Sequence, residues 1–215
     1  MLITERYLDQ VQIWPQRGRH ILAQYDDLSI VVYQAYRPAI AHYAVDYQRF
    51  GGEFSYSRMS WIKPNFLWMM YRSGWGTKED QEVVLALRLR RPFFDALLAQ
   101  AVPSSWEPDL FPSREAWSHV VRGSEVRLQW DPDHDPHGER LLRRALQLGL
   151  RGSALKAFGQ QALLEVLDLS AFVAEQRARL AVEGAAALHT PQERVYRPAN
   201  PEVAARLGLA HAPEE

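Results

Sequence analysis

The residues best suited to chemistry are concentrated in one segment, residues 33–75. This segment holds twelve of the chain's 24 aromatic residues, together with four arginines and one lysine. Arginine binds phosphate through paired hydrogen bonds, and aromatic faces stack on nucleobases or on a nicotinamide ring. The segment therefore predicts an aromatic-lined anion site. Its candidate ligand-binding residues are Tyr33, Tyr36, Arg37, Arg58, Trp61, Lys63, Arg72 and Trp75.

The same composition also has a purely structural explanation. The cations could pair with carboxylates or cover apolar surface, while the tryptophans fill the core. Residues 33–75 would then be mostly core, and the functional site would lie elsewhere in the chain.

Candidates for a catalytic role are few. Glu53 or Glu82 could orient a substrate hydroxyl, and His42 lies within the segment, where a satisfied, partly buried histidine is the alternative. The sequence contains no nucleophile elbow, no phosphate-binding loop and no dinucleotide fingerprint with three spaced glycines. The pattern of residues thus leaves the catalytic residues unassigned.

The stretch DPDHDPHGE, residues 131–139, begins like a calcium-binding loop. Its alternating aspartates would suit a hard cation, and His134 and His137 would suit a transition metal. However, Pro136 stands where the calcium loop needs a glycine, and Leu142 replaces its terminal glutamate. We therefore expect a solvated loop and no bound metal.

The composition restricts the class of protein. The chain has 215 residues, a net charge of −1 and no cysteine. A charge near zero gives no overall attraction for nucleic acid or membranes, and the lack of cysteine excludes disulfides and thiolate chemistry. The N-terminus lacks a signal pattern, and no apolar run could span a membrane. We therefore expect a soluble, cytoplasmic protein with no membrane partner.

Hydrophobic periodicity and turn residues predict alternating strands and helices. Strands are expected at residues 29–34, 54–62, 83–89, 125–130 and 145–150, the fourth of them stopped by Asp131-Pro132. Helices are expected from Pro38 to Gly51-Gly52, from Pro64 to residue 73 and from Pro92 to residue 101, and at residues 114–121, 153–166, 169–184 and 201–207. Arg37 then falls at the corner between a strand and a helix, where backbone amides attract anions. Arg72 falls in the last turn of a buried helix.

These elements predict an α+β (mixed α/β) fold with a central sheet of about four to six strands flanked by helices. A single globular domain is expected over residues 1–190. Residues 191–215 are expected to form a C-terminal tail that is partly docked on it.

Several motifs resemble a family of bacterial and fungal proteins, the domain of unknown function 4291. The resemblance rests on VVYQAYR at 31–37, RMSWIKPNFLWMMYRSGWG at 58–76, VRLQWDP at 126–132, ALQLGL at 145–150 and ERVY at 193–196. It covers nearly the whole chain and implies that the chain is one complete unit. It brings no activity, cofactor or catalytic residue with it.

Three functional hypotheses follow. The first is an enzyme that acts on a phosphate-bearing ligand, such as a nucleotide, an NAD-like dinucleotide or an RNA end. Its more specific form is an ADP-ribosyltransferase-like enzyme that uses NAD as cofactor. The second is a non-catalytic module that binds nucleic acid or protein through the same patch. In the third, the segment is core. A carboxylate within reach of a bound ligand would favour the first. The substrate and the oligomeric state stay open.

Overall fold

The computed structural model describes residues 2–209, and its centre is a sheet of three antiparallel strands in the order β10-β6-β4. Valine and leucine dominate the middle strand, and its first five residues, 83–87, are all buried. Such a run is typical of a strand that is covered on both faces. The strands are β4 (Ser29–Tyr36), β6 (Val83–Arg90) and β10 (Leu163–Asp168).

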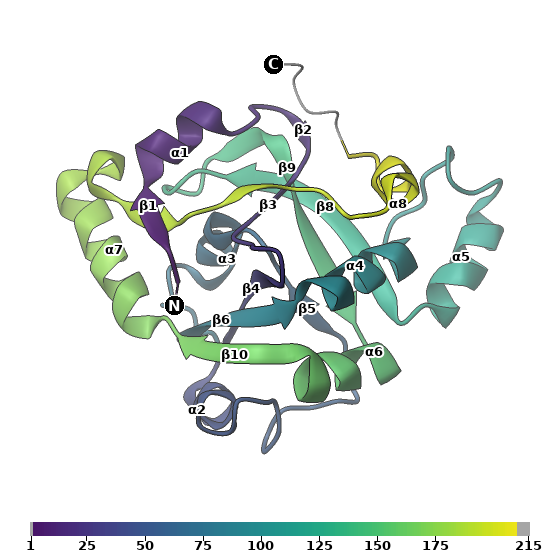
Figure 1. The fold of residues 1–215 in the computed structure, drawn as a ribbon, viewed down its shortest axis with the longest axis horizontal. Coiled ribbons are helices and arrows are strands. Elements are labelled where there is room, and N and C mark those ends of the chain that lie inside the picture. Colours follow the sequence, from purple (N-terminus) through teal and green to yellow (C-terminus); the bar gives the residue numbers. More distant parts are fainter. Residues whose placement is uncertain (1, 210–215) are drawn as a thin grey trace.

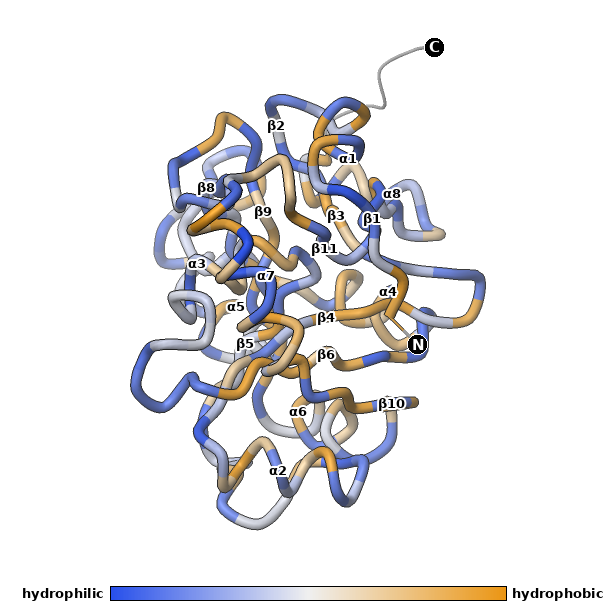
Figure 2. The backbone as a smooth tube through the Cα atoms, turned by 90° about the vertical axis from the view of Figure 1, so that its left-hand side faces the viewer, coloured by the Kyte–Doolittle hydropathy of each residue, from blue (hydrophilic) through white to orange (hydrophobic). Residues whose placement is uncertain are grey.

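Alternate residues of this sheet enter two separate hydrophobic clusters. Val32 and Leu85 belong to one cluster, whereas Val31 and Val84 belong to the other. Figure 2 shows the hydrophobic stretches of β4 and β6 in the middle of the molecule and many hydrophilic segments in the loops around them. Burial of both faces therefore fixes the position of this sheet in the core.

A second, curled sheet contains the long hairpin of β8 and β9. Within it, Leu128 and Leu148 form a cross-strand pair that faces the core, and the next pair, Gln129 and Gln147, faces the opposite side. The strand order is β2-β9-β8-β7, and β5 pairs with β9. The strands are β2 (Gly18–Arg19), β5 (Ser60–Ile62), β7 (Val102–Pro103), β8 (Val126–His134) and β9 (Arg140–Leu150).

A backbone bridge joins the two sheets. The Tyr33 N–H donates to the Lys63 carbonyl at 2.6 Å, and the Lys63 N–H donates to the Tyr33 carbonyl at 3.2 Å. Lys63 directly follows β5, which itself pairs with β9. The bridge therefore places the second half of β4 beside the segment that continues from β5, at the edge of the second sheet.

Helices surround the sheets and complete a mixed α+β single-domain fold. In Figure 1, α7 and α1 lie at one side of the molecule, α5 and α8 lie at the other, and α2 lies below β10. No helix in residues 2–209 is long and apolar enough to cross a membrane. The helices are α1 (Tyr7–Ile13), α2 (Pro38–Tyr47), α3 (Phe66–Ser73), α4 (Arg91–Gln100), α5 (Arg114–Gly123), α6 (Gly152–Ala157), the π-helix η1 (Phe158–Ala162), α7 (Ser170–Glu183), the 3₁₀-helix η2 (Ala185–Ala187) and α8 (Pro201–Arg206).

Helix α3 is buried, as its sequence predicts. It begins at Phe66, two residues after the expected Pro64, because the Asn65 side chain accepts the Trp68 N–H at 2.7 Å as an N-cap. Gly74 ends the helix in the left-handed conformation, with φ at 59°. The buried carboxylate of Glu193 accepts the Phe66 N–H at 2.6 Å and so fixes the helix N-terminus from a distant part of the chain.

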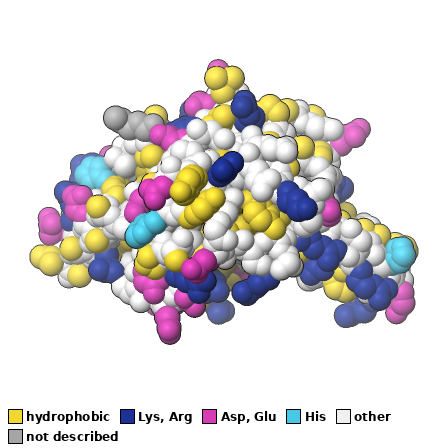
Figure 3. All heavy atoms as spheres, turned by 90° about the horizontal axis from the view of Figure 1, so that it is seen from below, with side chains coloured by type: hydrophobic (Ala, Val, Ile, Leu, Met, Phe, Trp, Pro, Cys, Tyr) yellow, Lys and Arg dark blue, Asp and Glu magenta, His cyan; other side chains and the backbone are white. Residues whose placement is uncertain are grey.

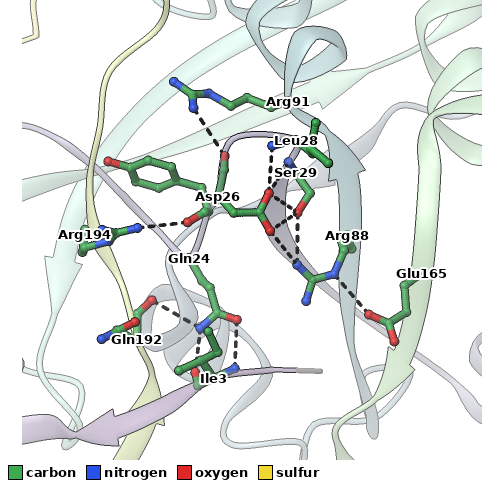
Figure 4. Close-up of polar contacts among 11 residues, drawn as sticks. Ile3, Gln24, Asp26, Leu28, Ser29, Arg88, Arg91, Glu165, Gln192 and Arg194 are labelled. Atoms are coloured by element: carbon green, nitrogen blue, oxygen red, sulfur yellow. Dashed lines mark hydrogen bonds and ion pairs between the residues drawn. The ribbon is translucent and has the colours of Figure 1, made fainter.

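The C-terminal segment pairs with N-terminal strands. β12 (Arg194–Tyr196) pairs with β3 (Ile21–Ala23), and β11 (His189–Pro191) pairs with β1 (Thr4–Arg6). Figure 4 shows the polar contacts beside β12: Arg194 donates to the Tyr25 carbonyl at 3.1 Å, and Arg91 donates to the Asp26 carbonyl at 3.3 Å. Residues 210–215 of the expected tail lie outside the described residues.

Two expected elements near the candidate site are shorter than predicted. The strand expected at 54–62 exists only as β5, because the Phe54 N–H closes a turn on the Gly51 carbonyl and the aromatic rings of 54–56 pack inward. Helix α2 ends at Tyr47, before the two glycines, because Gln48 takes the left-handed conformation with φ at 52°.

Two further predictions of secondary structure are wrong. The helix expected at 153–166 ends at residue 162, and residues 163–168 form β10, where pairing with β6 overrides the local helical pattern. Asp131-Pro132 does not stop β8, which continues to His134. The register with β9 shifts between Pro132 and His134, and such an irregularity accommodates the missing N–H of proline.

Candidate functional site

An open cleft of about 680 Å³ lies at the junction of the two sheets. Its walls come from the end of β4, the loop before β5, the last turn of α3 and the outer face of β8 and β9. The volume suits a nucleotide-sized ligand. Most of the predicted ligand-binding residues line it, namely Tyr36, Arg37, Arg58, Trp61, Lys63 and Arg72.

The other two predicted ligand-binding residues lie elsewhere. Tyr33 is fully buried and packs edge-on against Phe66, with ring centroids 5.5 Å apart. Trp75 lines a separate pocket beside α7 and donates its indole N–H to the Pro136 carbonyl at 3.2 Å. Both rings therefore support the fold around the cleft without facing it.

Only one of the three catalytic candidates reaches the cleft. Glu53 lines it, whereas Glu82 and His42 are exposed outside it. The Glu82 carboxylate accepts the Asp80 N–H at 3.0 Å, and His42 lies on the surface of α2. Of these three candidates, the structure thus leaves Glu53 in position to meet a ligand.

Lys63 is the most unusual side chain of the cleft. It is 5% exposed, and within residues 2–209 its ammonium group has neither an ion pair nor a hydrogen bond. The ammonium group lies over the Trp68 ring, with Nζ 5.7 Å from the ring centroid. Burial and, to a smaller extent, the positive charge of Arg72 lower the pKa of Lys63 to about 8, although Asp131 partly opposes them. This cation is costly to the fold when no anion accompanies it.

Two arginines add to the positive charge. Arg58 lies in the loop before β5 and Arg72 in the last turn of α3, and both side chains are exposed at the cleft. Neither has an ion pair or a side-chain hydrogen bond in the described part of the chain. Arg72 thus reaches solvent at the end of a buried helix.

Arg37, unlike Arg58 and Arg72, forms an ion pair with a carboxylate of the cleft. Its Nη2 atom lies 2.5 Å from Glu53 Oε2, and the two side chains are 46% and 60% exposed. An ion pair with this exposure contributes little to stability, because water screens it and two flexible side chains must be ordered. The pair can therefore open to release the guanidinium or the carboxylate to a ligand.

Two glutamines and an aspartate form a polar floor on the outer face of β8 and β9. The Asp131 carboxylate accepts the Gln129 side-chain amide at 2.8 Å and the Gln147 side-chain amide at 2.6 Å. A carboxylate only accepts hydrogen bonds, so both amides must direct N–H toward Asp131. Their carbonyl oxygens accept no hydrogen bond within residues 2–209.

The end of β4 supplies a second hydrogen-bonded group. The Tyr36 hydroxyl lies 2.7 Å from the Ser60 hydroxyl, which also accepts the Gln34 amide at 2.7 Å. Burial raises the pKa of Tyr36, so its phenol stays protonated at neutral pH. These contacts lock β4 to β5 along one wall of the cleft.

The glutamines of the floor were not singled out from the sequence. Both lie within strands that were predicted, and both occupy polar positions between leucines or beside a tryptophan. What the sequence lacks is the register that places Gln129 opposite Gln147. A polar, uncharged residue at a half-buried strand position is the one signal that could have indicated them.

The fold and the site together define an α+β protein with a cationic cleft above an amide floor. A family model described as a domain of unknown function (DUF4291) matches residues 20–196, and the chain belongs to this family. The match includes every residue that lines the cleft. A search of the curated proteins finds no match.

Proposed function

We propose that the chain is an enzyme that acts on a phosphate-bearing ligand bound in the cleft. The observation that carries the proposal is the group of Arg58, Lys63 and Arg72, which line the cleft without an anionic partner in residues 2–209. A buried, unpaired ammonium is unfavourable, and a phosphate beside it would remove that cost. Bound phosphate thus explains why the fold would keep Lys63 at this position.

The proposed ligand is a nucleotide, an NAD-like dinucleotide or an RNA end. Lys63 and Arg72 would bind its phosphate groups, and the guanidinium of Arg72 offers the planar fork that suits bidentate contacts. Trp61 is half-buried at the cleft and offers a ring for stacking.

Two side chains supply the proposed chemistry. An amine with a pKa of about 8 is present in both protonation states near neutral pH, which suits a general acid or base. Glu53 is the carboxylate that could orient a substrate hydroxyl. Transfer of ADP-ribose from NAD is one specific form of this proposal, with Glu53 as its carboxylate.

A non-catalytic module that binds nucleic acid or protein is the alternative use of the cleft. A module that binds long nucleic acids needs a continuous basic track. On the face shown in Figure 3, Lys and Arg side chains lie in separate groups with hydrophobic and acidic side chains between them. This observation, with the net charge of −1, favours a small ligand in the cleft.

Calorimetric titration with ATP, NAD and a short 5′-phosphorylated RNA tests the proposal. We expect at least one of them to bind, and Arg58→Ala and Arg72→Ala to weaken that binding about tenfold or more, as for the loss of a charge-assisted contact. Arg72→Lys should restore little, because the planar fork is lost. Arg90→Ala is the matched control, because Arg90 is exposed at the far end of β6.

Analysis of the products formed from the bound ligand distinguishes an enzyme from a non-catalytic binding module. Conversion of that ligand, reduced in Glu53→Gln, supports the enzyme, and binding without any conversion supports the module. If no phosphate compound binds the wild type, or if the two alanine variants bind as the wild type does, the phosphate site is excluded.

A further inference from the structure

The floor of the cleft offers hydrogen-bond acceptors, whereas its cations offer hydrogen-bond donors. Gln129 and Gln147 are cross-strand neighbours, and both anchor their amide N–H groups on the same carboxylate, Asp131. Opposite residues of an antiparallel pair have Cβ atoms about 5 Å apart. The two side chains therefore line the cleft as neighbours. Their carbonyl oxygens accept no hydrogen bond within residues 2–209, so a ligand would meet them with hydrogen-bond donors.

An aromatic ring lies beside this floor. A Cβ atom added to Gly149 would lie 2.9 Å from the Trp61 ring and 2.8 Å from the Met59 sulfur. Trp61 and Gly149 are cross-strand partners, so the absence of a side chain lets the indole lie directly over the sheet. Gly149 and Gln147 also share one face of β9, which places the ring next to the glutamines.

The cations adjoin the same floor. Ile62 is the antiparallel partner of Leu148, so Lys63 comes next to Gln147 along the sheet. A single ligand can therefore contact a cation, an aromatic ring and two carbonyl acceptors. Phosphate itself is unsuited to the floor, because its oxygens would face the carbonyl oxygens without a donor between them.

We infer that the cleft selects a nucleotide whose ring carries an amino or carboxamide N–H₂ group, with this group donating to the Gln129 and Gln147 carbonyl oxygens. The inference rests on the proposed phosphate site, since the phosphate end of the ligand is bound there. The orientation of both glutamines is set by Asp131, so this specificity is built into the sheet before a ligand arrives.

Three matched pairs of mononucleotides test the inference by calorimetric titration. Each pair retains the phosphate and removes one N–H₂ group: AMP against purine riboside monophosphate, CMP against UMP, and nicotinamide against nicotinic acid mononucleotide. We expect the amino or carboxamide member of at least one pair to bind about tenfold more tightly, as for a buried donor that finds its acceptor.

We expect the preference for the amino or carboxamide nucleotide to depend on Gln129 and Gln147. Gln129→Met and Gln147→Met should each reduce the ratio within the pair to about twofold or less, while affinity for pyrophosphate stays unchanged. Gln100→Met is the matched control, because Gln100 is exposed at the end of α4 and does not line the cleft. Circular dichroism melts of each variant confirm that the fold is retained.

The failures of the two proposals can be told apart. If the mononucleotides bind but no pair shows a preference, or if the methionine variants keep it, the inference about the floor is overturned and the phosphate site stands. If neither pyrophosphate nor any mononucleotide binds, the phosphate site itself fails, and the inference fails with it.

Discussion

Burial lowers the pKa of the Lys63 amine from an ordinary value of 10.5 to about 8, with Arg72 adding to the effect. This displacement corresponds to ~3 kcal/mol of unfavourable free energy while the amine is charged. We therefore predict that Lys63→Met, which keeps a side chain of similar length, raises the free energy of unfolding by ~1–3 kcal/mol at neutral pH. Urea denaturation of the two proteins measures the difference.

The pH dependence of stability provides the control. Between pH about 8 and 10.5 the unfolded chain binds the Lys63 proton more strongly than the folded chain, so wild-type stability should rise with pH in this window. The methionine variant lacks this contribution, and its advantage should shrink as the pH rises. A methionine variant that is less stable than the wild type at every pH would show that Lys63 already has a stabilising partner.

Some residues of the candidate site could be predicted from the sequence and others could not. Arginine, lysine and tryptophan close together in a sequence are conspicuous, and two residues chosen in this way, Lys63 and Arg72, line the same cleft. Tyr33 and Trp75 show the limit of that reasoning, because composition does not tell which rings of an aromatic segment face inward. Gln129 and Gln147 were missed because a glutamine in a strand has no distinctive pattern.

Among the elements, α3 is expected to contribute most to the stability of the cleft. Its residues 66–70 are buried, and Leu67 is 2% exposed. We predict that Leu67→Ala lowers the free energy of unfolding by ~2–5 kcal/mol, because it removes buried methyl groups and leaves a cavity. Val182→Ala on α7, where the side chain is 84% exposed, is the control and should change little. An unchanged melting temperature for Leu67→Ala would remove α3 from the core.

The turn between β8 and β9 is predicted to bind no structural metal. Its aspartates have other partners: Asp133 forms a buried ion pair with Arg143 at 2.7 Å, and Asp135 accepts the His137 and Glu139 N–H groups at 2.9 Å. Within residues 2–209 no three acidic or histidine side chains are grouped to bind a metal. Treatment with a chelator should leave the melting temperature unchanged. A drop that one specific cation reverses would contradict this reading.

Elements with strong local signals were predicted best. β4, β6, α4 and α7 have clear hydrophobic patterns or a proline at the first turn, and their positions agree with the sequence to within a few residues. β10 was missed because its pairing with β6 comes from a segment more than 70 residues away. β8 was predicted too short because an irregularity in the ladder, invisible in the sequence, accommodates Pro132.

At the scale of the whole molecule, the cleft exists because distant segments meet. Residues 34–72 supply most of the cations and rings, and β8 and β9 supply the floor. The α+β class follows from the order of the elements, but the cleft depends on the bridge between Tyr33 and Lys63 and on the pairing of β5 with β9. Such long-range pairings leave no pattern in a short stretch of sequence. The sequence therefore predicted the cations and rings of the candidate site but not the floor that faces them.

The most direct test of an anion site around Lys63 is the pH dependence of ligand binding. The measurement is calorimetric titration of the wild type with pyrophosphate at pH ~7 and ~9.5. With a pKa of about 8, the free amine is mostly charged at the lower pH and mostly neutral at the higher one. We predict an affinity that falls ~10–30-fold between the two, and a Lys63→Met variant that binds weakly at both. Equal affinity of the wild type at both pH values, or a methionine variant that binds as tightly as the wild type, would contradict the account.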